Sequence, residues 1–379
     1  MGPPAMTTLQ SAARQVHESI RSATSGLIGR EQLAELMILA AVAQEHLLVV
    51  GPPGTAKSAV VRRVAHAMGG RYFEYLLGRF TEPSELFGAV DLKKLREGTV
   101  ETDVTGMLPE AEIVFLDEVF LGSTAILNTL LGVLNERRFR RGHTQIACPL
   151  RVCVGAANGL PDDESLAAFG DRFLLHLFVQ PVPDHQLEAM LAGGWQSDMR
   201  AVVAHAGVAD LDTLSGAVRD VRLDDIRPRL AHAIRQLRAA GVQLSDRRIV
   251  KSQRLIAAAA VLAGRLQATE ADLWPLFYVL PTDEAQQSAR DVLREQFAGA
   301  ASHHLSFAAE QAAMQPLSRA GRLLAEAERC LAGGGDDRQQ QGDMEALLRE
   351  IDANYSPQTL PPELAGLRSR LAERIAVSS

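Results

Sequence analysis

One stretch, residues 46–58 with the sequence HLLVVGPPGTAKS, limits the possible folds of this chain more than any other. Residues 46–50 are mostly apolar and β-branched, as in a buried strand, and residues 59–68 have the apolar spacing of a helix. A strand, a Gly-rich turn and a helix predict a phosphate loop, whose backbone N–H groups surround a phosphate beside a helix N-terminus. Lys57 is expected to reach the β- and γ-phosphates of a nucleotide, and the Ser58 hydroxyl to bind Mg²⁺. The alternative is a chance Gly-Pro turn before a helix.

The loop departs from the pattern G-x-x-x-x-G-K-[ST] at one position, where Ala56 replaces the last glycine. Alanine is the smallest replacement that keeps a Cβ, so we expect it to be tolerated if its φ is negative. Upstream, Ile28 and Gly29 belong to a Gly-Leu-Ile-Gly segment where a purine could pack, and a plain turn before a helix is an equal alternative. The remaining predicted nucleotide contacts are Gly51, Pro52, Pro53, Gly54, Thr55, Ala56, Lys57, Ser58 and Ala59.

A second apolar run, residues 113–116, ends in two carboxylates, Asp117 and Glu118. A buried strand of a parallel sheet would deliver them to the edge where such sheets bind ligands. Asp117 is then expected to hold Mg²⁺ through water, and Glu118 to orient and polarise the attacking water. The alternative is an acidic helix N-terminus, where carboxylates are favoured in any case.

Three further sequence features indicate functional residues less strongly. Asn158 follows an apolar strand and could bond the γ-phosphate or the attacking water, although Asn is also a common turn former. Arg247 and Arg248 begin a helix expected over 246–266, against the helix dipole, which suggests that they face a phosphate across a domain cleft; a solvated pair is the alternative. A basic hairpin predicted at 137–146 could touch nucleic acid or a substrate chain, but we favour a solvated hairpin or a subunit contact.

The chain has 379 residues, too many for one ordinary domain. Its α/β alternation ends near residue 183, which predicts an α/β core over 1–183, a helical region over 184–285 and a helical extension over 286–379. Residues 88–109 are expected to form an inserted hairpin, and residues 333–343 a flexible low-complexity loop.

Composition excludes some classes of protein. No apolar run approaches the ~20 residues of a membrane span, and the N-terminus does not have the pattern of a signal peptide. Three cysteines without a paired pattern fit a reducing cytosol, so a cytoplasmic location is expected, with Cys148 and Cys153 as buried thiols. The net charge of −7 makes nucleic acid an improbable partner.

Several segments together resemble AAA+ ATPases of the MoxR family, and within it the RavA subgroup. These segments are residues 51–58, 74–88, 108–120, 125–140 and 156–173. The resemblance implies an α/β P-loop core with a parallel sheet, an all-α lid and a helical C-terminal extension. It also implies a helix-2 insert at about 88–109 and a pre-sensor-1 hairpin at about 137–150, and alanine before the phosphate-loop lysine is usual in that family.

The resemblance implies a role for each matching residue. Lys57 and Ser58 match Walker A, Asp117 and Glu118 match Walker B, and Asn158 matches sensor 1. Arg172 matches a candidate arginine finger, which would reach the γ-phosphate bound by a neighbouring subunit. Arg247 matches sensor 2, with Arg248 as a near alternative. The expected cofactors are ATP or ADP and Mg²⁺.

The function implied is a hexameric ring that hydrolyses ATP at subunit interfaces and remodels a protein client, beside a partner with a von Willebrand factor A domain. RavA proteins also bind a decarboxylase through a β-rich C-terminal domain, which the helical pattern here does not match. Two rivals are a nucleic-acid-dependent AAA+ motor that uses the basic hairpin, and a scaffold that binds ATP to assemble and scarcely hydrolyses it.

Overall fold

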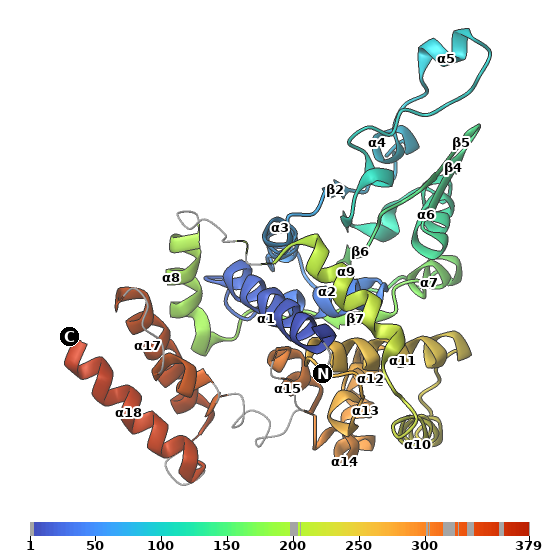
Figure 1. The fold of residues 1–379 in the computed structure, drawn as a ribbon. Helices are drawn as coiled ribbons and strands as arrows, with labels where there is room; N and C mark the ends of the chain where they lie inside the picture. Colours follow the sequence, from blue (N-terminus) through green and yellow to red (C-terminus); the bar gives the residue numbers. More distant parts are fainter. Residues whose placement is uncertain are drawn as a thin grey trace.

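A five-stranded parallel sheet organises the first half of the chain, in the strand order β2-β3-β6-β1-β7 (Figure 1). The structure is a computed structural model that describes residues 4–197, 204, 206–300, 302, 304–313, 323–324, 326–331, 337–355 and 360–378. The strands of this sheet are β1 (Leu47–Val50), β2 (Tyr72–Leu76), β3 (Ile113–Asp117), β6 (Val152–Ala157) and β7 (Leu175–Phe178). Because all are parallel, the segments that follow them meet at one carboxyl-terminal edge.

The apolar strands are buried on both faces, as expected for a parallel sheet covered by helices. Alternate side chains of β1 enter different cores: Leu47 and Val49 lie in one buried cluster, and Leu48 and Val50 in another. The first cluster includes α1 (Pro4–Thr24), α2 (Glu31–Ala43) and α3 (Lys57–Met68). The second includes α6 (Thr124–Glu136) and the end of α7 (Glu164–Gly170). The expected α/β core is therefore confirmed as a sheet between two layers of helix.

Two inserts interrupt this core and are bonded to each other. The hairpin formed by β4 (Arg138–Arg141) and β5 (Thr144–Ala147) agrees with the prediction, and Phe139 is buried against Phe87 at 5.5 Å between ring centroids. The other insert follows α4 (Pro83–Phe87). Its Thr102 N–H donates to Thr144 Oγ1 at 2.8 Å, so the two chain segments that lead into and out of this insert, its legs, lie beside the hairpin.

The insert at 88–109 was expected to be a hairpin and is not one. Its legs share a single antiparallel bridge, Val90 with Thr102, and between them lies a short helix, α5 (Leu92–Arg96), which stands far from the sheet in Figure 1. The Asp91 side chain caps this helix by accepting from two backbone N–H groups, a local bond that no apolar periodicity reveals. Similarly, Glu82 is the N-cap residue of α4, and the Thr81 hydroxyl accepts from Gly78 N.

Helices follow the sheet, as predicted. They begin with η3 (Asp184–Gln186), α8 (Leu187–Ser197), α9 (Val208–Ala217) and η4 (Val218–Asp220). The series continues with α10 (Arg227–Ala239), α11 (Asp246–Leu262), η5 (Glu270–Asp272), α12 (Pro275–Tyr278) and α13 (Asp283–Val292). The long helix α11 ends at Leu262, earlier than the expected 266. Its apolar residues share a buried cluster with α2, so this helical region packs directly on the core.

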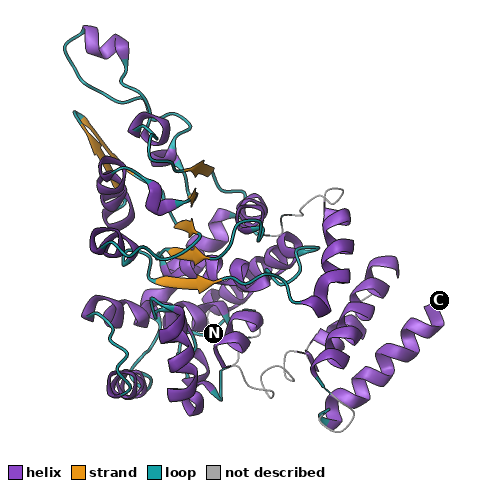
Figure 2. Cartoon of the chain, turned by 180° about the vertical axis from the view of Figure 1, so that it is seen from behind, coloured by secondary structure: helices purple, strands orange, loops and turns teal. Residues whose placement is uncertain are grey.

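The C-terminal part contains α14 (Arg294–Phe297), α15 (Ser306–Ala313), α17 (Asp337–Asn354) and α18 (Pro362–Ser378). The last two helices contribute to a separate hydrophobic cluster, away from the sheet in both ribbon views (Figures 1 and 2). Residues 333–336 of the predicted flexible loop lie outside the described residues, but from Asp337 onward the loop prediction is wrong. Residues 338–341 are Arg-Gln-Gln-Gln, and both residue types are good helix formers although the stretch has low complexity.

One simpler prediction is confirmed. Cys148 and Cys153 are buried and free, and burial raises the pKa of the Cys153 thiol to about 12. Among the helices described, none has the length and apolar character needed to cross a membrane.

Candidate nucleotide site

The phosphate loop leaves β1 at the carboxyl-terminal edge of the sheet, where space is very tight. A Cβ placed on Gly51 would come within 2.4 Å of the Val179 carbonyl oxygen, so only glycine fits there. The Gly51 N–H donates to Ala157 O at 3.0 Å. The entry to the loop is thus pressed between β6 and the segment that follows β7.

Ala56 has a left-handed backbone, with φ 60° and ψ 23°, immediately before α3 begins. The condition under which alanine was expected to be tolerated, a negative φ, is therefore not met. A residue with a Cβ in this region carries a steric cost of about 1–2 kcal/mol. Strained backbone of this kind persists where the surrounding structure holds it, and it is concentrated at functional sites.

Lys57 lies inside the loop. Its Nζ donates to Gly51 O at 2.8 Å and Pro52 O at 3.0 Å, and the residue is buried. Burial lowers the pKa of Lys57, and the nearby charges of Asp117 and Glu118 oppose that shift. The loop carbonyls therefore hold the ammonium group beside the two predicted carboxylates.

Asp117, Glu118 and Asn158 come together where β3 and β6 end. The Glu118 N–H donates to Asp117 Oδ1 at 3.0 Å, and Asn158 Nδ2 donates to Glu118 Oε1. Glu118 is another non-glycine residue with a left-handed backbone, φ 50° and ψ 46°. The strained backbone and the amide together fix the direction of the Glu118 carboxylate, as a water-orienting group requires.

Arg30 belongs to this site and was missed by the sequence interpretation. Its buried guanidinium donates from Nε to Thr55 O at 2.7 Å, from Nη1 to Gly29 O at 2.7 Å, and from Nη2 to Gln180 O at 3.3 Å. Burial lowers the pKa of Arg30. The residue therefore ties the segment containing half-buried Ile28 to the phosphate loop. Only its position directly after Gly29 could have indicated it.

The site fits Mg²⁺ by the chemistry of its donors. Ser58 is the second residue of α3, and the Asp117 carboxylate lies near the same loop, as its effect on Lys57 shows. No group of three or more His, Cys, Asp or Glu side chains able to hold a metal occurs among the described residues. Mg²⁺ at nucleotide sites is usually held by one or two protein ligands, with phosphates and water completing the octahedron, so Ser58 and Asp117 would suffice.

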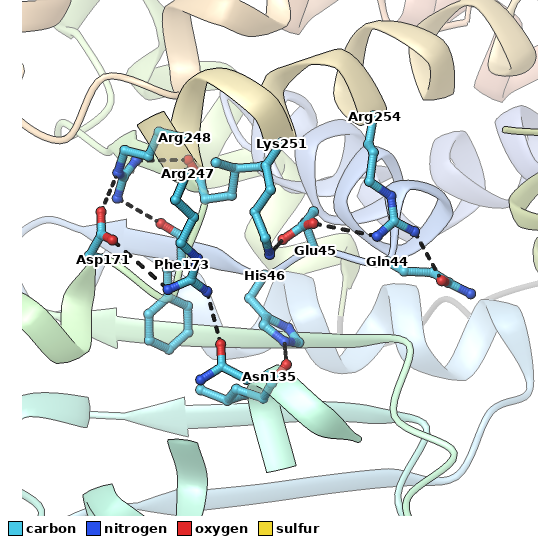
Figure 3. Close-up of polar contacts among 12 residues, drawn as sticks. Gln44, Glu45, His46, Asn135, Asp171, Phe173, Arg247, Arg248, Lys251 and Arg254 are labelled. Carbon is cyan, nitrogen blue, oxygen red and sulfur yellow. Dashed lines mark hydrogen bonds and ion pairs between the residues drawn. The ribbon is translucent and has the colours of Figure 1, made fainter. Parts of the chain in front are cut away.

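Arg247 and Arg248 lie away from the phosphate loop, so within this chain the expectation that they face a phosphate across a domain cleft is not met. Figure 3 shows them on α11 beside Asp171, which precedes β7 and so lies at the amino-terminal edge of the sheet. Arg247 donates from Nη2 to Asn135 Oδ1 at 2.8 Å, and its Nη1 is 4.0 Å from Asp171 Oδ2.

Arg248 is buried and not solvated. It bonds Asp171 Oδ1 at 2.6 Å and the carbonyl oxygens of Phe173, Leu174 and Val279. Its bonds join the helical region to the core, so Arg248 is a structural residue, whereas Arg247 is half-buried.

Arg172 lies at this same amino-terminal edge, next to Asp171 in the chain. It is half-buried, and its Nε has no hydrogen-bond partner within the described part of the chain. The structure therefore brings together Lys57, Asp117, Glu118 and Asn158, and it places Arg172 and Arg247 at the opposite edge.

The sheet order, the phosphate loop after β1 and the helical lid together define the AAA+ class of ATPase. A family model described as the MoxR domain in the MoxR-vWA-beta-propeller ternary systems matches residues 14–216, and an AAA lid domain model matches residues 223–292. The chain therefore belongs to the MoxR family of AAA+ ATPases.

Known proteins agree with this assignment. Two uncharacterized proteins of Methanocaldococcus jannaschii are similar: one is 33% identical over 251 residues, 66% of each chain, and the other 31% identical over 280 residues, 73% of this chain and 72% of that one. The chaperone MoxR1 of Mycobacterium tuberculosis is 26% identical over 173 residues, 44% of this chain and 45% of its own. A crystal structure of a candidate ATPase from Cytophaga hutchinsonii has the same fold, with a TM-score of 0.62, 15% identity and coverage of 76% and 96%.

Proposed function

We propose that this chain hydrolyses ATP to ADP and phosphate with Mg²⁺, as a ring-forming MoxR-type remodelling ATPase. The observation that supports this best is the bond from Asn158 to Glu118, beside Asp117 and Lys57 at one edge of the sheet. A site that only binds nucleotide would not need an oriented carboxylate next to the phosphate loop.

Each residue has a defined task in this proposal. Lys57 leaves the loop carbonyls to bind the β- and γ-phosphates, while Ser58 and Asp117 hold Mg²⁺. Held there, Mg²⁺ would neutralise the charge that develops on the phosphate oxygens. Glu118 orients and polarises the attacking water, and Asn158 keeps the Glu118 carboxylate in position.

The two arginines at the amino-terminal edge support a ring. Neither Arg172 nor Arg247 bonds the phosphate loop of its own chain among the described contacts. In a hexamer this edge would face the nucleotide of the next subunit, where a guanidinium can stabilise the charge of the transition state. Arg172 is the proposed finger, and Arg247 lies next to it across Asp171.

The biological role is also a proposal. The name of the matching family model supports a partner with a von Willebrand factor A domain. The protruding insert with α5 and the hairpin bonded to it are the proposed contacts for a protein client. The RavA-like subgroup and the cytoplasmic location stay predictions.

The exposed arginines of the hairpin, Arg138 and Arg140, keep one rival open, a nucleic-acid-dependent motor. Arg140 is already paired with Glu136 at 2.9 Å, and the net charge of −7 opposes such binding. DNA-stimulated turnover that falls steeply with salt would favour this rival over a protein client.

ATP turnover measured against protein concentration, with the mass determined at each point, tests the proposal. We expect specific activity to rise as the species grows to a hexamer. Arg172→Ala should be inactive alone and partly rescued in mixed rings that contain subunits with an intact arginine. Turnover that is independent of concentration, from a species shown to be monomeric, would refute the ring; no turnover at any mass would favour the assembly scaffold.

A further inference from the structure

A groove of about 350 Å³ lies on the helical region, between α11 and the segment that contains η4. Its floor is apolar and buried, formed by Val218, Val221 and Ala257. Its rim carries three guanidinium groups, from Arg219, Arg227 and Arg254. No carboxylate lines the groove, although the whole chain has a net charge of −7.

The rim arginines are available to a ligand. Arg219 is exposed and forms no ion pair or hydrogen bond with the part of the chain that is described. Arg227 pairs with Asp224 at 2.7 Å, but the two side chains are 56% and 80% exposed, so the pair contributes little.

Arg254 is also weakly held. Figure 3 shows it reaching towards Glu45, whose Oε1 is 3.8 Å away, and donating to Gln44 Oε1 at 3.1 Å. Lys251 already holds Glu45 at 2.6 Å. Arg254 lines the groove in this conformation, while Lys251 holds the buried Glu45 carboxylate through Oε2.

The combination of an apolar floor and an arginine rim restricts the chemical class of ligand that can bind in the groove. Guanidinium groups bind carboxylates through paired, charge-assisted hydrogen bonds. A nucleic acid backbone would satisfy the arginines, but it offers no aliphatic group for the floor. An acidic protein segment satisfies both surfaces.

We propose that this groove is a docking site for an acidic segment of a partner protein. The segment places an aliphatic side chain on the Val218, Val221 and Ala257 floor, and its carboxylates pair with the arginine rim. None of the groove residues belongs to the nucleotide site, so docking and hydrolysis can be tested separately.

Selection of random dodecapeptides displayed on phage against the full chain tests this proposal without assuming a sequence. The winning peptides are then synthesised with a fluorophore, and their affinity is measured by anisotropy. We expect them to carry Asp or Glu around Leu, Ile or Val. Arg219→Glu should weaken binding by about tenfold or more, the change that corresponds to about 1.4 kcal/mol. Replacing the peptide's acidic residues with their amides should have a similar effect.

The matched control is Arg235→Glu, the same charge change at an exposed arginine of α10 outside the groove. It should leave the affinity unchanged, and circular dichroism verifies that both variants are folded. Peptides without acidic residues, equal losses in the two variants, or an oligonucleotide that displaces the peptide from the groove would each overturn the proposal.

Discussion

Replacement of Arg248 by methionine should destabilise the protein much more than the same replacement at the neighbouring Arg247. Arg248 bonds one carboxylate and three backbone carbonyls, and its side chain is 3% exposed. Methionine fills a similar volume but leaves those acceptors without their donor. Breaking a buried ion pair by removing one partner costs about 3–5 kcal/mol. Because Asp171 is 33% exposed and can take up water, we expect the lower end, about 3 kcal/mol.

Arg247→Met is the matched control, one residue away on the same helix. Its side chain is 29% exposed, and it has one hydrogen bond, to the exposed Asn135. Pairs of this kind contribute about 0–1 kcal/mol, so the stability of this variant should change little.

Urea unfolding followed by tryptophan fluorescence measures the difference. Trp274 is fully buried at the start of α12, close to the contacts of Arg248, so its emission reports unfolding of this region. A loss below about 1 kcal/mol for Arg248→Met, or equal losses for the two variants, would refute the role given to Arg248.

Three further changes test other parts of the structure. Glu118→Gln should keep ATP binding but lower turnover by about 100-fold or more, since a positioned base contributes 10²–10⁴; nucleotide binding and turnover are measured separately. Ala56→Gly should leave the free energy of unfolding unchanged or raise it by up to about 1 kcal/mol, measured by urea unfolding. Glycine removes the steric strain of the left-handed backbone, and this gain equals or exceeds the entropy by which glycine stabilises the unfolded chain. Burial lowers the pKa of His46 and of His176 well below 6.5, so below that pH the unfolded chain binds more protons, and the free energy of unfolding decreases as the pH is lowered. Each histidine should lower the free energy of unfolding by about 1 kcal/mol when the pH is lowered from 6.5 to 5.5, measured by urea unfolding at both pH values.

Controls for these changes lie nearby. Loss of ATP binding in a folded Glu118→Gln protein would contradict the role given to that carboxylate. Ala59→Gly, in the first turn of α3, should destabilise, unlike Ala56→Gly; the same sign for both would contradict strain at Ala56. His46→Gln should flatten the pH dependence, because it removes one of the two buried imidazoles. An unchanged slope in His46→Gln would contradict a neutral buried imidazole.

The core of the fold followed from sequence because its signals are local. A buried parallel strand is a short apolar run, and the polar residues after it, such as Asp117 and Asn158, must appear at one edge of the sheet. Lys57 and the loop around it could be placed for the same reason.

The rest depended on contacts between segments distant in sequence. Arg30 was missed because its partners, Thr55 and Gln180, are 25 and 150 residues away. The position of Arg247 could not be derived because it depends on how α11 packs against the core. The φ of Ala56 is set by the tight path of the loop, which the residue's own preference opposes.

The protruding insert separates an exposed surface from the nucleotide site. The short helix α5 buries none of its side chains, and its Leu92 and Leu95 are exposed. The legs of the insert approach so closely that a Cβ on Gly88 would lie 1.8 Å from Asp103 O, so the base tolerates little change. Because the tip buries no side chain, mutations there should cost the folded core almost nothing and leave the nucleotide site unaltered.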